Sequence, residues 1–229
     1  GPGFSKSMWW TINISDYLKD VQTTLRATAA DQKSAMAEFD RIWRDVLRVA
    51  ENDISGIKPT LREISRRIAA IPLARRMEDV PRVLIVGEIY VRRDDFAVDE
   101  IVGLFSGKGI IAKVSGITEW IRYLGFVREY DLKKRLRLQP FYKRPFSLEA
   151  KKLLRLRVEN LWKDWVEHGV KRSLAATRLV PPSPENMKRI MANAKRHFIN
   201  FELNSEIVIS SASAATAMEE GYSGVINIS

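Results

Sequence analysis

The hydrophobic pattern divides the chain into an N-terminal helical part and a C-terminal part that contains short apolar runs. Over residues 8–52, apolar side chains recur every three to four positions, which predicts one long amphipathic helix with Ser15 or Asp16 as its N-cap. The same pattern returns over residues 57–71 and ends at Pro72. We expect these two helices to form an antiparallel pair and to bury their apolar faces in a core rather than in a membrane.

A run of β-branched residues, Val83–Val86, predicts a strand that is buried on both faces. A helix over 96–105 is expected to follow, and residues 110–114 predict a second strand. This strand–helix–strand order implies a parallel pair with a right-handed crossover.

The rest of the chain predicts three further helices and two further strands. The helices cover about 147–169, 184–201 and 212–220, and the strands cover 206–210 and 224–228. We therefore expect an α/β fold with a small, mostly parallel, flavodoxin- or Rossmann-like sheet of about four strands. Helices should cover both faces of this sheet, with the N-terminal helical pair as an addition.

The domain organisation follows from the same pattern. Residues 8–78 are expected to form a helical region packed on an α/β domain of residues 79–229, and a basic helical insertion interrupts that domain at about 128–180. Residues 1–7 are expected to be a tag or vector remnant, because Gly1 and Pro2 are typical of the residues that a tag-cleaving protease leaves. Two tryptophans of the insertion, Trp162 and Trp165, are expected to anchor the core.

Ligands of open parallel sheets bind outside the carboxyl ends of the strands, so a ligand-binding site is expected there. The candidate ligand-binding residues are Gly87, Glu88, Tyr90, Arg92, Glu119, Trp120, Tyr123, Ser210 and Ser211. In the structural alternative, Gly87 only turns the chain while Glu88 and Arg92 pair with each other or cap a helix. Ser211 could bind an anion near a helix start, or it could be an N-cap alone.

The basic charge is concentrated in residues 128–157, which hold eleven Lys or Arg against three acidic residues, in a chain of formal net charge +10. The candidate polyanion-binding residues are Lys133, Lys134, Arg135, Arg137, Lys143 and Arg144. Phe141, Tyr142 and Phe146 lie between them and could stack on nucleic-acid bases. The alternatives are an anionic small molecule such as a CoA diphosphate, an acidic protein, or a solvated helix face with an apolar stripe.

The 229-residue sequence contains no cysteine and only two histidines, His168 and His197. It therefore has no thiolate zinc site and no cysteine-held iron–sulfur cluster, and we expect no cofactor and no metal in this chain. It also lacks a P-loop, GxGxxG, GxSxG and HExxH, so we assign no catalytic residue, although Glu88 and Glu119 could act as an acid/base pair if they meet. Without a long apolar run or a signal peptide, we expect a cytoplasmic protein with no membrane partner.

Three stretches resemble the activator-related proteins of the 2-hydroxyacyl-CoA dehydratase system. They are GEIYVR at Gly87–Arg92, EWIRY at Glu119–Tyr123 and, more weakly, EGYSGVINI at Glu220–Ile228. The similar segment lies in the large portion of those proteins, outside their actin/Hsp70-like ATPase, and covers about residues 68–126. Where the family usually has an Asn near a helix start, this chain has the stretch 94–99, DDFAVD.

The resemblance implies a non-catalytic or ligand-binding α/β domain, a fragment of a protein that supports ATP-driven electron transfer to acyl-CoA substrates. Its partners would be other domains or subunits of that system, and its ligand an acyl-CoA or another anionic small molecule. In similar sequences, a Pro-Phe-x-Cys-like element follows the last strand and would begin at Ser229. An iron–sulfur cluster could then belong to a longer parent protein, and nucleic acid is not the partner that the resemblance implies.

Overall fold

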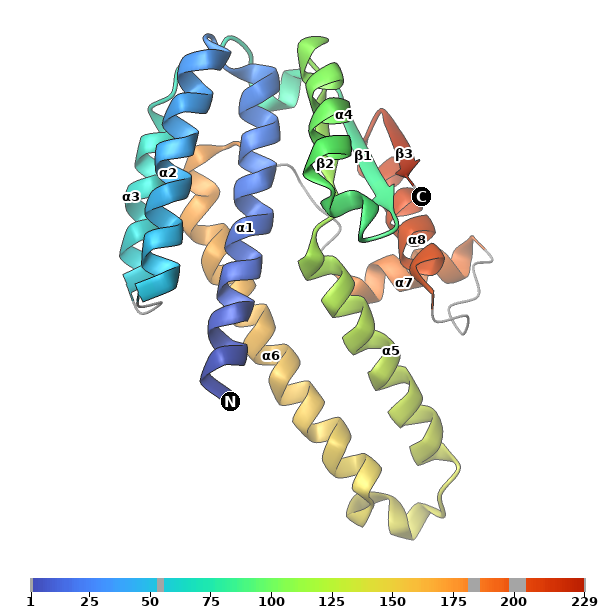
Figure 1. Ribbon diagram of the computed structural model, residues 1–229. Coiled ribbons are helices and arrows are strands. Elements are labelled where there is room, and N and C mark those ends of the chain that lie inside the picture. The colour runs from blue at the N-terminus through green and yellow to red at the C-terminus, as the bar shows by residue number, and fades with distance from the viewer. Residues whose placement is uncertain (1, 53–55, 181–185, 198–204, 229) are drawn as a thin grey trace.

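The computed structural model describes residues 2–52, 56–180, 186–197 and 205–228, and these form an α/β fold that is mostly helical (Figure 1). The helices are α1 Pro2–Thr28, α2 Gln32–Asn52, α3 Ile57–Ala69, α4 Asp95–Gly107, α5 Ile117–Arg137, α6 Leu148–Leu174, α7 Met187–Arg196 and α8 Glu206–Glu219. The strands are β1 Arg82–Gly87, β2 Ile111–Val114 and β3 Gly224–Ile228. Short 3₁₀ turns are η2 Met77–Asp79, η3 Val91–Arg93, η4 Phe141–Phe146 and η5 Ala175–Thr177.

The single helix predicted over 8–52 is wrong, because the chain turns back between α1 and α2. Asp31 begins the second helix: its carboxylate accepts hydrogen bonds from two backbone N–H groups, at 3.0 and 3.2 Å, and so satisfies donors of the first turn. The expected caps, Ser15 and Asp16, lie in the middle of α1. Residues 2–7, the expected remnant, form its first turns.

Helices α1, α2 and α3 and the C-terminal part of α6 bury one common core. Its members include Ile14, Leu18, Val21, Leu25, Phe39, Ile42, Val46, Ile57, Leu61, Ile64, Ile68, Val170 and Leu174. The N-terminal apolar faces are thus buried, as expected, but in a four-helix arrangement rather than in a pair (Figure 1). None of the described helices is long and apolar enough to cross a membrane.

The described sheet has three strands in the order β2-β1-β3, and both pairs are parallel. The strands expected near 83–86, 110–114 and 224–228 are confirmed. The strand expected over 206–210 is wrong, because these residues begin α8. Val208 and Ile209 are buried there while Ile207 is 72% exposed, so the apolar run is one face of a helix.

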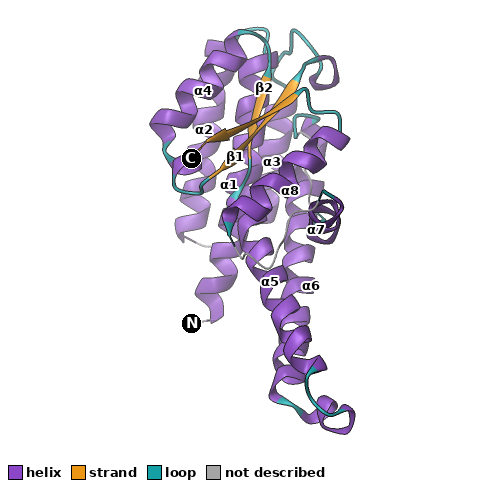
Figure 2. Cartoon of the chain, turned by 90° about the vertical axis from the view of Figure 1, so that its right-hand side faces the viewer, coloured by secondary structure: helices purple, strands orange, loops and turns teal. Residues whose placement is uncertain are grey.

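Helices cover both faces and one edge of this sheet (Figure 2). Helix α4 packs on the face of Val83 and Ile85, and α8 packs on the opposite face, that of Leu84 and Val86. Helix α1 runs along the β2 edge, which has no strand partner there among the described residues. The long N-terminal helix therefore joins the helical bundle to the sheet.

Helices α5 and α6 form a hairpin that projects away from the body and carries the basic segment (Figure 1). Ser147 caps α6 as expected, since its Oγ accepts a hydrogen bond from the Ala150 N–H at 3.1 Å, but the helix continues past Gly169. Trp165 is 57% exposed and is not a core anchor. The limits expected for the next helix lie outside the described residues, within which α7 begins after its N-cap, Asn186.

The turn after β1 requires glycine. Gly87 has φ +130°, and a Cβ there would fall on the backbone carbonyl of Ile228.

We expect Gly87→Ala to lower the free energy of unfolding by more than about 2 kcal/mol, because the backbone strain and the steric overlap add. Gly103→Ala is the matched control: a Cβ there meets nothing within 4 Å, so this helical position should gain about 0.5–1 kcal/mol. Urea unfolding measures both, and equal stabilities would contradict the account.

Candidate functional site

The candidate site lies where β1 and β2 end and α5 begins. Glu88 follows β1, and its carboxylate accepts a hydrogen bond from the Val91 N–H at 3.1 Å. This bond caps the short η3 turn, so Glu88 has the role that the structural alternative gave it. The Ile89 N–H donates to Glu206 of α8 at 2.9 Å, a link that the sequence did not indicate.

Arg92 ties the two strand ends together. Its side chain is buried, and it donates to the carbonyl oxygens of Gly87 at 2.9 Å and Ser115 at 2.6 Å. Glu88 and Arg92 therefore do not form the ion pair that the structural alternative allowed, because the guanidinium donates to backbone carbonyl oxygens instead. Burial lowers the pKa of Arg92, an effect that the nearby Glu119 carboxylate opposes.

Helix α1 supplies a carboxylate to the start of α5. Asp16 Oδ2 accepts the Thr118 N–H at 2.7 Å, and Asp16 Oδ1 accepts from Arg93 at 2.8 Å. Gly116 allows this approach, because a Cβ there would overlap the Asp16 carboxylate. A helix N-terminus attracts an anion, so Asp16 occupies the position that an external anion would take.

A second residue of α1, Asp20, pairs with Lys113 of β2 at 2.6 Å, and each side chain is only 7% exposed. Burial alone would lower the pKa of Lys113, but the attraction of Asp20 outweighs it and holds that pKa above its ordinary value. A buried lysine in the middle of a strand is rare unless it has a partner. Lys113 within the apolar run 110–114 could therefore have indicated a buried anion, although the sequence does not show which one.

Glu119 begins the row of polar side chains on α5. It is partly buried and contacts the Ser213 hydroxyl of α8. Burial raises its pKa, while the hydrogen bond from Ser213 and the charge of Arg92 oppose the shift. Glu88 and Glu119 have different hydrogen-bond partners, and no contact between them supports an acid/base pair.

A further cluster surrounds Glu167 of α6. The Tyr17 hydroxyl donates to Glu167 at 3.1 Å, and Arg122 forms an ion pair with the same carboxylate at 3.2 Å and another with Asp164. Burial raises the pKa of Glu167, and Arg122 opposes the rise. Burial and the Glu167 charge both raise the pKa of Tyr17.

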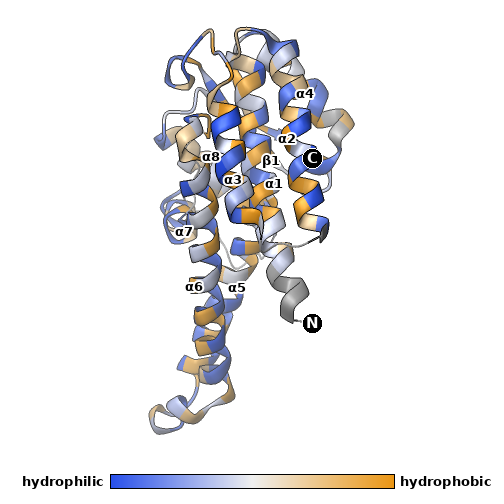
Figure 3. Cartoon of the chain, turned by 90° about the vertical axis from the view of Figure 1, so that its left-hand side faces the viewer, coloured by the Kyte–Doolittle hydropathy of each residue, from blue (hydrophilic) through white to orange (hydrophobic). Residues whose placement is uncertain are grey.

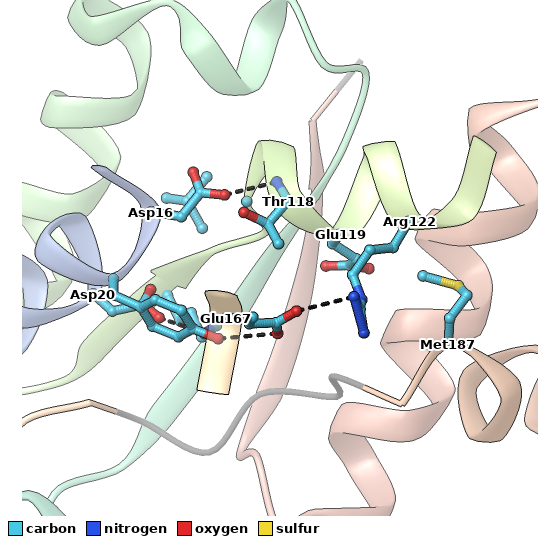
Figure 4. A pocket seen from close by; sticks show the side chains of 11 residues that line it. Asp16, Asp20, Thr118, Glu119, Arg122, Glu167 and Met187 are labelled. Atoms are coloured by element: carbon cyan, nitrogen blue, oxygen red, sulfur yellow. Dashed lines mark hydrogen bonds and ion pairs between the residues drawn. The ribbon is translucent and has the colours of Figure 1, made fainter. Parts of the chain in front are cut away.

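These groups enclose a small cavity of about 50 Å³, room for a few water molecules or one small polar group (Figure 4). Its lining includes Asp16, Asp20, Lys113, Thr118, Glu119, Arg122 and Glu167. Three buried atoms of lining residues, Thr118 Oγ1, Arg122 Nε and Glu167 Oε2, have no hydrogen-bond partner among the described residues. The first two can donate to an acceptor oxygen, and the third can accept from a donor. A neighbouring pocket of about 250 Å³ shares Asp16 and Asp20.

The other expected site residues lie around this cavity or away from it. Ser210 lies mid-helix rather than at a strand end, yet its Oγ donates to the Gly87 carbonyl at 3.4 Å. Ser211 is in the same helix, not at its start, so it is not an N-cap. Tyr123 is core, with its hydroxyl on the Ser205 carbonyl at 3.2 Å, and Tyr90 is 82% exposed. Trp120 is half-buried and does not line the cavity.

The expected polyanion-binding residues form a separate region at the far end of the α5–α6 hairpin. Lys133 pairs with Glu129 at 2.6 Å, and Arg144 donates to the carbonyl oxygens of Arg137 and Gln139, each at 2.9 Å. In the described part of the chain, no group of three or more His, Asp or Glu side chains could hold a metal ion.

The Asp20–Lys113 pair is expected to dominate the stability of the site. Lys113→Met leaves a buried carboxylate without its cation and should cost about 3–5 kcal/mol in urea unfolding. Adding Asp20→Leu should restore most of this loss, because both charges are then gone. Arg66→Met breaks the exposed pair with Glu63 and should cost about 1 kcal/mol or less. Equal costs for the two single variants would contradict a buried pair.

The raised pKa of Glu119 predicts a pH dependence. The folded chain holds this proton to a higher pH than the unfolded chain, whose carboxyl has the ordinary pKa of 4.5. The free energy of unfolding should fall as the pH rises from about 4.5 through the raised pKa, by at most about 1.4 kcal/mol per pH unit for this group.

In Glu119→Gln this decline should be shallower, and the part that remains should come from Glu167 and Asp20, whose pKa values burial also raises. Glu149→Gln is the control. Hydrogen bonding from Gln139 lowers the pKa of Glu149, so this carboxyl makes the free energy of unfolding depend on pH only below about pH 4.5. Denaturant unfolding between pH 5 and about 7 measures the slopes. An unchanged slope in Glu119→Gln would show that this carboxyl does not titrate there.

Comparisons with known proteins found no match. No protein-family model fits the chain, and neither the curated proteins nor the solved structures include one that is similar to it. The resemblance to the dehydratase activators therefore rests on residues 87–92, 119–123 and 220–228 alone.

Proposed function

We propose that this chain is a non-catalytic, ligand-binding α/β domain of a protein related to the activators of 2-hydroxyacyl-CoA dehydratases. The observation that supports the proposal is where the resembling stretches lie. Gly87–Arg92 and Glu119–Tyr123 flank the same strand ends, and β3 of the third stretch pairs with β1 beside them. These segments, which are far apart in the sequence, thus meet at one edge of the sheet, and Glu119 and Arg122 of the second stretch line the cavity.

The contacts of the cavity favour a ligand group with an acceptor oxygen. Thr118 Oγ1 and Arg122 Nε can both donate. The carboxylates of Asp16, Asp20 and Glu119 already accept hydrogen bonds, and Glu167 Oε2 has Arg122 as its ion-pair partner at 3.2 Å. A volume of about 50 Å³ admits an acyl carbonyl or a small carboxylate but not a nucleotide. An acyl-CoA would therefore place only its acyl end here, and Asp16 keeps the diphosphate away from the start of α5.

The wider setting belongs to the same proposal. The three-stranded sheet would be a reduced form of a Rossmann-like sheet, and the protein would be cytoplasmic. An iron–sulfur cluster would be held by other parts of a longer parent protein, and other domains or subunits of that system would be the partners. This chain would contribute the acyl site and the scaffold, with no catalytic residue of its own.

Thermal unfolding with added acetyl-CoA tests the proposal on the whole chain. Ligand binding to the folded state should raise the Tm in a concentration-dependent way, and coenzyme A without an acyl group should raise it less. Thr118→Val removes one donor and should weaken acetyl-CoA binding roughly fivefold, the cost of about one hydrogen bond.

Thr60→Val is the matched control, because the Thr60 hydroxyl lies in α3 and donates to the carbonyl of Gly56, the N-cap of that helix, at 2.9 Å. It should leave acetyl-CoA binding unchanged. If acetyl-CoA does not raise the Tm, or if both valine variants bind it equally, the cavity holds water alone and the proposal fails.

A further inference from the structure

The apex of the α5–α6 hairpin combines exposed apolar side chains with a one-sided charge. Residues 133–148 contain six Lys or Arg and no Asp or Glu. Within them, Leu138, Phe141 and Phe146 are each more than 80% exposed, and Tyr142 and Leu148 are exposed as well. Monomeric proteins rarely expose so many large apolar groups in one place, and such a patch is typical of an interaction surface.

These apolar side chains are not needed to hold the hairpin together. Leu132, Leu153 and Leu156 form its core, with Leu136 packed against them, and the apex residues lie outside that cluster. Arg144 fixes the shape of the apex through its hydrogen bonds to two backbone carbonyls, and the Ser147 hydroxyl donates to the Arg144 carbonyl at 2.8 Å. The apex is thus a preformed convex surface.

We propose that this apex binds the surface of an anionic phospholipid bilayer. Phenylalanine, tyrosine and leucine side chains enter the boundary between headgroups and acyl chains, while lysine and arginine attract the negative headgroups. Exposed Arg135, Arg137 and Lys143 lie beside the apolar residues and provide that charge. Because the hairpin projects from the body, its end reaches a flat surface without obstruction (Figure 2), and it mixes hydrophobic and hydrophilic residues (Figure 3).

A nucleic acid fits this apex less well. A base could stack on only one face of two of these rings, because Lys143 lies over the Tyr142 ring and Arg144 over the Phe141 ring, each 5.8 Å from the ring centre. Leu138 and Leu148 add apolar area that phosphate binding does not use. The proposal concerns surface contact rather than spanning, and it replaces the expectation, drawn from composition, that the chain has no membrane partner.

Co-sedimentation with vesicles tests the proposal. The whole chain should bind vesicles of equal parts phosphatidylserine and phosphatidylcholine, and should bind pure phosphatidylcholine vesicles much more weakly. The double variant Phe141→Ser, Phe146→Ser should lose about tenfold or more in vesicle affinity. Phe96→Ser is the matched control, since Phe96 is as exposed as Phe146, at 83%, but lies on α4, and this variant should bind like the wild type.

The charge is tested separately. Arg137→Gln with Lys143→Gln should weaken binding to the same vesicles by about fivefold for each charge removed. Arg41→Gln with Arg48→Gln removes the same charge from exposed positions of α2 and should have little effect. Two results would overturn the proposal: no binding to the mixed vesicles, or equal losses in the apex and control variants. Binding of an oligonucleotide at low salt in place of the vesicles would identify nucleic acid as the partner instead.

Discussion

A lysine in the middle of a buried strand stays charged only if an anion is buried with it. Lys113 of β2 meets this condition through Asp20 of α1, which lies 93 positions earlier in the chain. Leaving either charge alone in the interior would cost several kcal/mol, so the arrangement of the two elements is constrained by the pair. The first helix therefore cannot shift along the β2 edge without breaking it.

The other buried polar contacts extend this constraint to the remaining layers. Asp16 joins α1 to the start of α5, Tyr17 joins it to Glu167 of α6, and Glu119 joins α5 to Ser213 of α8. Each contact connects elements that are far apart in the sequence. The small cavity is what remains between them, which is why its lining is polar and why Thr118 Oγ1, Arg122 Nε and Glu167 Oε2 have no hydrogen-bond partner among the described residues. The same contacts give the site its order.

The hydrophobic pattern along the chain was enough to predict the elements whose apolar positions recur at a regular spacing. All three strands and α4 were predicted near their observed positions, because β-branched runs between glycines are distinctive. The strand over 206–210 failed because a three-residue apolar run does not distinguish a strand from one helical face. The helix over 8–52 failed because the turn between α1 and α2 depends on one cap, that of Asp31.

The sequence pointed to the edge of the sheet where the candidate site lies, but it indicated few of the residues that form the site. The rule for parallel sheets pointed to Gly87, Arg92 and Glu119, which do lie at the strand ends. Asp16, Tyr17, Asp20 and Glu167 were missed as site residues because nothing local shows that α1 and α6 reach this edge. The basic apex was noticed for its charge, but only the structure shows that its aromatic and leucine side chains are exposed together.

Buried charges make α1 and the sheet one cooperative unit. Native-state hydrogen exchange, followed amide by amide in rising denaturant, tests this coupling. Amides near Asp20 in α1 and near Lys113 in β2 should open with the same free energy and the same denaturant dependence. Opening of α1 at a clearly lower free energy, with β1 and β2 still protected, would contradict it.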